Sequence, residues 1–140
     1  MTRAAALGLV VALGFAASPT AAEHEVFYRY TVLGFVKDAA GQPLRGRAVE
    51  LVRDKTGFSY VGETDEQGLY ILIARLGDES AGERLTLRVS GASTTLTARF
   101  DPVNHTDERG TRVDVEGARF VERRAWFRST LVKALGDARR

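Results

Sequence analysis

Few side chains in this sequence can carry out chemistry. The 140-residue chain has no cysteine and two histidines, His24 and His105. A catalytic triad needs a base beside an activated serine or cysteine, and nothing in the sequence points to a Ser or Thr that is brought to His105. We therefore interpret His105 as a solvent-exposed loop residue and expect a protein that is not an enzyme.

The loop around His105 also offers oxygen ligands for a hard cation such as calcium. These ligands are Asp101, Asn104, Asp107 and Glu108. Their spacing matches no EF-hand, and a polar loop between two strands explains the same residues. We predict no metal site in this loop and no cofactor.

Two further kinds of chemistry depend on particular residues. Cleavage of the signal peptide after Ala21 would leave a mature chain that begins Ala22-Glu23-His24. A histidine at the third position lets the amino terminus bind Cu(II) or Ni(II) through nitrogen ligands. Cleavage after Ala22 fits the signal-peptide pattern better and removes that site. An isopeptide bond would join Lys37 to Asn104 with help from Glu50 or Glu63. Asn104 falls in a loop, so an ordinary solvated Lys37 is the preferred interpretation.

The start of the chain has the pattern of a secretory signal. Arg3 is followed by an apolar stretch of small residues from Ala4 to Ala17 and then by a small-residue exit that ends at Ala22. The apolar stretch is short for a membrane span, which needs about 20 residues. We predict a signal peptide over residues 1–22 and export to the periplasm or the extracellular space.

Charge is unevenly distributed along the rest of the chain. Residues 23–118 hold 12 Lys and Arg against 16 Asp and Glu, whereas residues 119–140 hold 7 basic and 2 acidic residues. An acidic body therefore carries a basic tail. Such a tail can bind acidic proteins or anionic lipid, and after export nucleic acid is not an expected partner.

Period-two alternation of apolar residues dominates the body and predicts strands. The predicted strands cover residues 26–36, 48–52, 58–64, 69–74, 85–89, 96–100 and 113–115. Seven short strands separated by turns are typical of an antiparallel β-sandwich. The absence of cysteine means that this fold must be stabilised by its core alone.

Two turn motifs separate these strands. In the first, Asp38 accepts backbone N–H groups, Gly41 takes a positive φ, Pro43 marks a strand margin and Gly46 suits a bulge. The second motif repeats this chemistry with Asp65 and Gly68, and Tyr70 follows one step into a strand. There the ring can pack and the hydroxyl can find a backbone partner.

At these residues the chain resembles the carboxypeptidase regulatory-like domain, a seven-stranded transthyretin-like β-sandwich. The residues that carry the resemblance are Gly34, Val36, Asp38, Gly41, Pro43, Leu44, Gly46, Val49, Leu51, Thr64, Asp65, Gly68 and Tyr70. The resemblance implies such a domain over residues 23–117. It implies no peptidase activity, because each matched residue has a turn or packing role.

The tail, residues 118–140, has a different period. Phe120, Phe127, Leu131 and Leu135 fall on one helical face, which predicts an amphipathic helix over residues 120–135. This helix has two interpretations. It can dock a partner protein or an anionic membrane surface, or it can fold back and cover part of its own sandwich. The candidate docking residues are Arg123, Arg124, Trp126, Phe127, Arg128 and Leu131.

The sequence as a whole favours a non-catalytic accessory or interaction module of the periplasm or cell envelope. Its partner would be an envelope protein. The alternative is a carbohydrate- or peptide-binding sandwich. Aromatic residues that could form a stacking platform for such a ligand are Tyr28, Tyr30, Tyr60 and Trp126.

Overall fold

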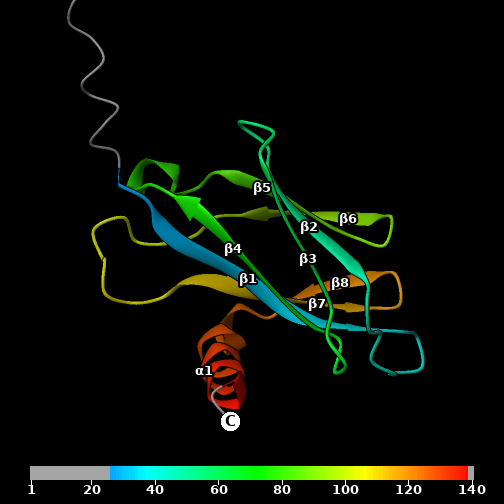
Figure 1. The fold of residues 1–140 in the computed structure, drawn as a ribbon. Helices are drawn as coiled ribbons and strands as arrows, with labels where there is room; N and C mark the ends of the chain where they lie inside the picture. Colours follow the sequence, from blue (N-terminus) through cyan, green and yellow to red (C-terminus); the bar gives the residue numbers. More distant parts are fainter. Residues whose placement is uncertain (1–25, 139–140) are drawn as a thin grey trace, which may run out of the picture.

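The computed structural model describes residues 26–138 (Figure 1). The predicted signal peptide, its cleavage site and His24 lie outside the described residues. Within residues 26–138 the chain forms eight strands, two short 3-10 helices and one α-helix. The strands are β1 (Tyr28–Lys37), β2 (Ala48–Arg53), β3 (Ser59–Glu63), β4 (Leu69–Leu76), β5 (Arg84–Val89), β6 (Ala92–Thr97), β7 (Arg109–Glu116) and β8 (Arg119–Glu122).

The helical elements are short and few. The 3-10 helices are η2 (Asp78–Ser80) and η3 (Arg124–Trp126), and the α-helix is α1 (Phe127–Ala138). The prediction of a mostly β protein with a C-terminal helix is confirmed. The helix, however, begins seven residues later than position 120, where it was expected.

The strands form two sheets of four strands each. One has the order β4-β1-β7-β8 and the other the order β3-β2-β5-β6. All pairs are antiparallel except β1 and β7, which run parallel. The expected purely antiparallel arrangement is therefore wrong for the first sheet. Alternation reveals which faces of a strand are buried but carries no information about the direction of its neighbour.

The expected count of seven strands is also wrong, because β8 lies in the segment that the sequence assigned to the helix. Arg119–Glu122 pairs antiparallel with the end of β7 after a turn at Gly117, which has a φ of +68°. Phe120 consequently packs against the core between the sheets and does not continue the apolar face of α1. A four-residue strand gives too little alternation to be distinguished from the start of a helix.

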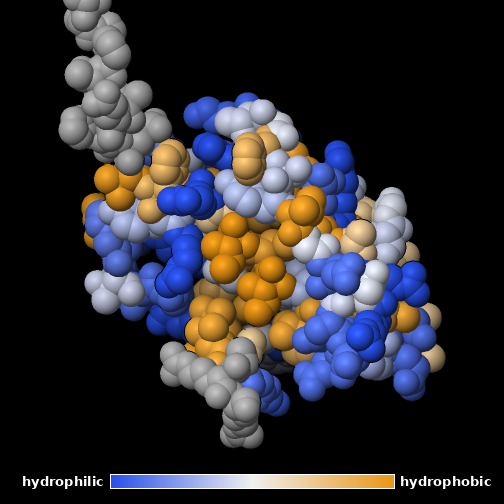
Figure 2. All heavy atoms as spheres, viewed as in Figure 1, coloured by the Kyte–Doolittle hydropathy of each residue, from blue (hydrophilic) through white to orange (hydrophobic). Residues whose placement is uncertain are grey.

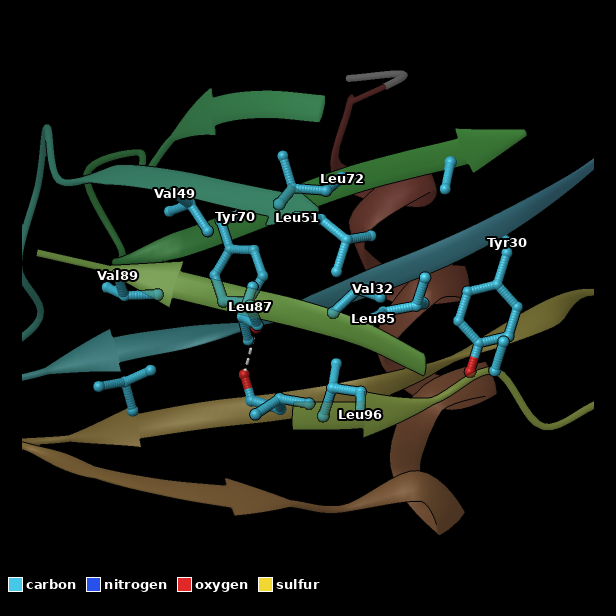
Figure 3. Close-up of a cluster of buried hydrophobic side chains, with 14 of the residues drawn as sticks. Tyr30, Val32, Val49, Leu51, Tyr70, Leu72, Leu85, Leu87, Val89 and Leu96 are labelled. Atoms are coloured by element: carbon cyan, nitrogen blue, oxygen red, sulfur yellow. Dashed lines mark hydrogen bonds between the residues drawn. The ribbon is translucent and has the colours of Figure 1, made fainter. Parts of the chain in front are cut away.

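The core lies between the two sheets. Inward side chains of β1, β4 and β7 meet those of β2, β5 and β6 (Figure 3). The largest fully buried side chains of this core are Tyr30, Tyr70, Leu51, Leu76, Leu85, Leu87, Val32, Val49 and Val113. The chain of 140 residues thus closes its core without disulfides, as the absence of cysteine requires.

Helix α1 lies on the outer face of the β4-β1-β7-β8 sheet (Figure 1). Its Phe127 and Leu131 form a second apolar cluster with Leu33, which points outward from β1. Gly110 makes the close approach possible, because a Cβ there would overlap both the Phe127 ring and the Thr31 carbonyl. The start of the helix is therefore fixed over β1 and β7.

Candidate functional site

The first turn motif holds the chain between β1 and β2. Both the Ala40 and the Gln42 N–H groups donate to Asp38 Oδ1 at 2.9 Å. Gly41 and Gly46 have φ values of +87° and +71°, which favour glycine. Pro43 forms an isolated bridge with Lys37 at the margin of β1.

The second turn motif has the same hydrogen-bond pattern as the first and packs against it. The Gln67 and Leu69 N–H groups donate to Asp65 Oδ1 at 2.8 and 2.9 Å. Gly68 has a φ of +78°, and a Cβ there would meet the Val36 carbonyl oxygen at 2.5 Å. The two motifs therefore build one end of the fold, and this geometry is structural.

Tyr70 and Asp114 make side-chain hydrogen bonds where the backbone pairing of β1 with β7 is interrupted. Residues Tyr30 to Leu33 of β1 have partners in β7, and the pairing resumes at Val36. The two residues of β1 between them have no partner in β7. The Phe35 N–H donates to Asp114 Oδ1 at 2.9 Å, and the Tyr70 hydroxyl donates to the Val113 carbonyl at 2.6 Å. Burial raises the pKa of the Tyr70 hydroxyl, so it stays a donor.

Two of the candidate docking residues in the tail are buried in the protein itself. The exposed fraction is 3% for Phe127 and 9% for Leu131, and both contact Leu33. The two apolar side chains are thus not available to a partner or a membrane. The structure brings the helix back onto its own sheet, which was one of the two interpretations of the sequence.

Three arginines of the tail are engaged with acidic residues, which lie in the body for Arg123 and Arg128 and in the tail itself for Arg124. Arg123 pairs with both Asp114 and Glu116, Arg124 pairs with Glu122 at 2.9 Å, and Arg128 pairs with Asp107 at 3.1 Å. The charges of these three arginines are therefore compensated within the fold.

Under the helix, these pairs join a buried network around Asp114. Arg112 Nε donates to both Asp114 oxygens at 3.0 and 3.1 Å, and its Nη2 donates to Oδ2 at 2.9 Å. Its Nη1 donates to Thr130 Oγ1 of α1 at 3.0 Å. The Arg112 and Arg123 guanidinium groups both lie over the Trp126 ring, at 5.3 and 5.5 Å from its centroid. Desolvation opposes ionisation of Asp114, but its hydrogen bonds from Arg112, the Phe35 N–H and Arg123 lower its pKa overall.

The outer face of β4 is apolar and is left open beside α1. Ile71 lies next to Leu33 in the β1–β4 register, and Ile73 lies next to Thr31. The helix covers Leu33, but the exposed fraction is 39% for Ile71 and 46% for Ile73. Leu135 and Val132 of α1 are also exposed. Figure 2 shows apolar side chains gathered over β4 and continuing onto α1.

We call Leu69, Ile71, Ile73, Ala134 and Leu135 the β4–α1 surface. A groove runs along one end of it, between the second turn and the C-terminal half of the helix. Its floor includes Leu69, Ile71 and Ala134, and its volume is about 810 Å³. Acidic residues line its rim: Glu63, Asp65, Glu66 and Asp137. Among residues 26–138, the one basic residue lining this groove is Arg45, which already pairs with Glu66 at 3.5 Å.

The sequence contained a signal for this surface that the prediction did not use. In residues 69–76 the inward residues Tyr70, Leu72 and Ala74 already supply a buried face. The intervening positions 71 and 73 are also isoleucines. A strand that is apolar on both faces must be covered on both, and β4 is an edge strand that is covered on only one.

The loop around His105 is held by polar contacts within the protein. His105 Nε2 lies 2.8 Å from Asp78 Oδ2, and the imidazole stacks on the Tyr28 ring at 4.5 Å. Although desolvation opposes it, hydrogen bonds from His105 and Arg109 lower the pKa of Asp78. His105 is exposed, and within residues 26–138 its side chain hydrogen-bonds to the Asp78 carboxylate and to no hydroxyl.

The acidic side chains that could serve as calcium ligands in this loop take part in other interactions. Asp101 caps the Val103 N–H, Asp107 accepts from Asn104 and pairs with Arg128, and Glu108 pairs with Arg29. Over residues 26–138, no group of three or more His, Cys, Asp and Glu side chains is arranged to hold a metal ion.

Arg109 is, like Asp114, a buried charge that the sequence analysis missed. Its guanidinium, 6% exposed, lies between the Phe100 and Tyr28 rings at 4.2 and 4.8 Å and pairs with Asp78 at 3.0 Å. It closes one end of the core. The alternation of β7 contained the signal, because position 109 shares its phase with the inward-facing Val113.

The four candidate stacking aromatics do not form one platform. Tyr30 is fully buried, and Tyr28 is covered by His105 and Arg109. Trp126 is exposed but belongs to the Asp114 network. Tyr60 lines an open cleft together with Phe27 and Phe58, and Tyr28 lines a separate, smaller one beside His105. Asn104, one of the isopeptide candidates, donates from its side-chain amide to Asp107 Oδ2 at 2.9 Å.

No helix in the described part of the chain is long and apolar enough to cross a membrane. No protein-family profile and no curated protein sequence matches the chain.

Two solved structures show weak similarity. One is the dioxygenase domain of a dioxygenase carbohydrate-binding protein fusion from the cellulolytic bacterium Streptomyces sp. SirexAA-E, with 16% identity, a TM-score of 0.38, and coverage of 67% of this chain and 75% of that one. The other is 3-chlorocatechol 1,2-dioxygenase from Rhodococcus opacus 1CP, with 16% identity, a TM-score of 0.39, and coverage of 71% and 59%. Similarity at this level carries no argument about activity or ligand.

Proposed function

We propose that this protein is a non-catalytic, exported accessory module of the periplasm or cell envelope that docks a partner protein. The observation that carries the proposal is the apolar outer face of β4, where Ile71 and Ile73 stay exposed beside the docked helix. Contiguous exposed apolar surface of this kind marks interaction sites in soluble proteins. The resemblance of the turn motifs to carboxypeptidase regulatory-like domains belongs to the same proposal.

A protein partner fits this surface better than an anionic membrane does. Membrane docking by a basic helix needs free cations beside apolar side chains. Here Arg123, Arg124 and Arg128 are paired with carboxylates, and Phe127 is buried. The rim of the groove on the β4–α1 surface is acidic, which repels anionic lipid.

The acidic rim of this groove also indicates what kind of partner segment would bind there. Its apolar side chains would cover Ile71 and Ile73, and its basic residues would meet Glu63 and Asp137 at the rim of the groove. We therefore expect an amphipathic, basic segment of an envelope protein. Burial of two isoleucines would give the apolar part of the interface, and the rim charges would speed association.

Site-specific crosslinking in cells tests this proposal. A photoreactive amino acid at position 73 should yield a discrete crosslinked product larger than the protein, because that position would lie in the interface. The matched control is position 95 in β6, whose threonine is exposed on the outer face of the other sheet. The same products from both positions, or none from position 73, would contradict the proposal.

A further inference from the structure

A second open cleft, separate from the β4–α1 surface, lies where the two sheets meet at their β3 and β4 edges. Its lining residues are Phe27, Arg53, Thr56, Phe58, Tyr60 and Arg75, and its volume is about 490 Å³. A cleft of this size falls within the range of small-molecule sites. Three aromatic rings from two chain segments converge there with two guanidinium groups.

The rings of the cleft are exposed and partly ordered by one another. The exposed fraction is 60% for Phe58 and 42% for Phe27, so both rings present free surface. The Phe58 and Tyr60 rings tilt against each other with centroids 5.0 Å apart. Tyr60 is further fixed because its hydroxyl accepts the Arg75 N–H at 3.2 Å. A flat apolar group can therefore bind a preformed aromatic wall.

The two arginines of the cleft are not equivalent. Arg53 is bound to Glu83 by two hydrogen bonds of 2.6 and 2.9 Å and to Ser80 at 3.1 Å, so its charge is compensated. Arg75 is exposed, and its guanidinium has no hydrogen bond or ion pair within the described residues. Among the described residues, Arg75 thus offers an unpaired positive charge beside the aromatic wall of the cleft.

We propose that this cleft binds a ligand that carries an aromatic ring and a carboxylate, the ring against Phe58 and Tyr60 and the carboxylate on Arg75. A guanidinium binds a carboxylate through two parallel hydrogen bonds, which sets the orientation of the ring. A sugar fits the cleft less well, because its many hydroxyls need polar partners and the wall offers phenyl rings. The ligand is either a free aromatic acid or the C-terminal aromatic residue of a peptide.

Titration of the full protein with N-acetyl-phenylalanine, followed by NMR, tests the proposal. We expect saturable shifts at Phe58, Tyr60 and Arg75, and binding at least about 5-fold weaker for the uncharged amide of the same compound, which cannot pair with Arg75. A pentapeptide ending in Phe, with a free or an amidated C-terminus, distinguishes the two sources. Tighter binding of the free-acid peptide than of N-acetyl-phenylalanine assigns the site to a chain end; the reverse assigns it to a free acid.

Matched variants separate the two parts of the site. Arg75→Gln should remove the preference for the carboxylate and keep ring binding, whereas Phe58→Ala should weaken both compounds. Arg88→Gln, which replaces an exposed arginine of β5 that lies outside the cleft and pairs with Glu50, should change neither. Equal binding of the acid and the amide to the unchanged protein, or binding of an oligoglucuronate but not of N-acetyl-phenylalanine, would overturn the proposal. None of these variants alters Ile71 or Ile73, so partner docking is tested independently.

Discussion

Two side chains, Tyr70 and Asp114, complete the hydrogen bonding of β1 and β7 where their backbone pairing is interrupted. The interruption occurs beside Gly34, where a Cβ would overlap the Val113 carbonyl. The sequence marked Tyr70 because a motif leads into it. No motif in the sequence indicated a role for Asp114, because its partners Arg112, Arg123 and the Phe35 N–H come from three separate segments.

Removal of the Tyr70 hydroxyl tests its role directly. Tyr70→Phe leaves the Val113 carbonyl without its partner in a buried position, so we expect a loss of about 1–3 kcal/mol in the free energy of unfolding. Urea denaturation followed by circular dichroism measures it. Tyr60→Phe, a half-buried tyrosine at the edge of the fold, should cost less than half as much. Equal losses in the two variants would mean that the Tyr70 hydrogen bond contributes no more to the free energy of unfolding than that of Tyr60.

Acid stability should depend on Asp114. Its pKa is lowered in the folded state, so its carboxylate stabilises the fold above the unfolded pKa of about 4 and this contribution is lost as pH falls through the folded pKa. Asp114→Asn should cost about 2–3 kcal/mol at pH 7 because two arginines lose their countercharge, and stability should then fall less steeply below pH 4. Denaturation series from pH 7 to pH 2 measure both effects.

The control for this pH series is Glu66→Gln, because Glu66 and its partner Arg45 are both exposed. Such a pair contributes about 0–1 kcal/mol, so the variant should follow the unchanged protein at every pH. An Asp114→Asn protein with the same acid slope as the unchanged protein would show that other carboxylates dominate acid unfolding.

At the scale of elements, the tail divides between sheet and helix at a point that periodicity did not reveal. Phe120, Phe127 and Leu131 have helical spacing, yet Phe120 belongs to β8 and faces the core between the sheets. The helix proper begins at Phe127, where the ring meets Gly110 and Leu33. Spacing along the chain cannot show that one member of such a series lies on a different element.

The anchoring of α1 should rest on Phe127. Phe127→Ala should lower the free energy of unfolding by about 2–4 kcal/mol, or release the helix locally, because it empties a buried site. Hydrogen exchange of the α1 amides together with urea denaturation measures both. Val132→Ala on the exposed side of the same helix should change stability by less than about 0.5 kcal/mol. Unchanged stability and unchanged exchange in Phe127→Ala would show that α1 is not held by this contact.

At the scale of the whole molecule, alternation and turn chemistry were enough to predict two layered sheets with a helix at the end. They could not predict that β1 and β7 run parallel, since strand direction depends on contacts between distant segments. Nor could they predict which outer face the helix covers. That choice leaves Ile71 and Ile73 open, and it is the basis of the proposed docking surface.

The most direct measurement of this docking role compares two charge variants in native envelope extracts. Size-exclusion chromatography should show the unchanged protein in a complex larger than its own mass. Ile73→Glu should shift it to the monomer position, because a carboxylate cannot be buried in an apolar interface without a large cost, whereas Thr95→Glu should leave the complex intact. Elution of all three proteins at the monomer position, or of all three in the same large complex, would contradict the account.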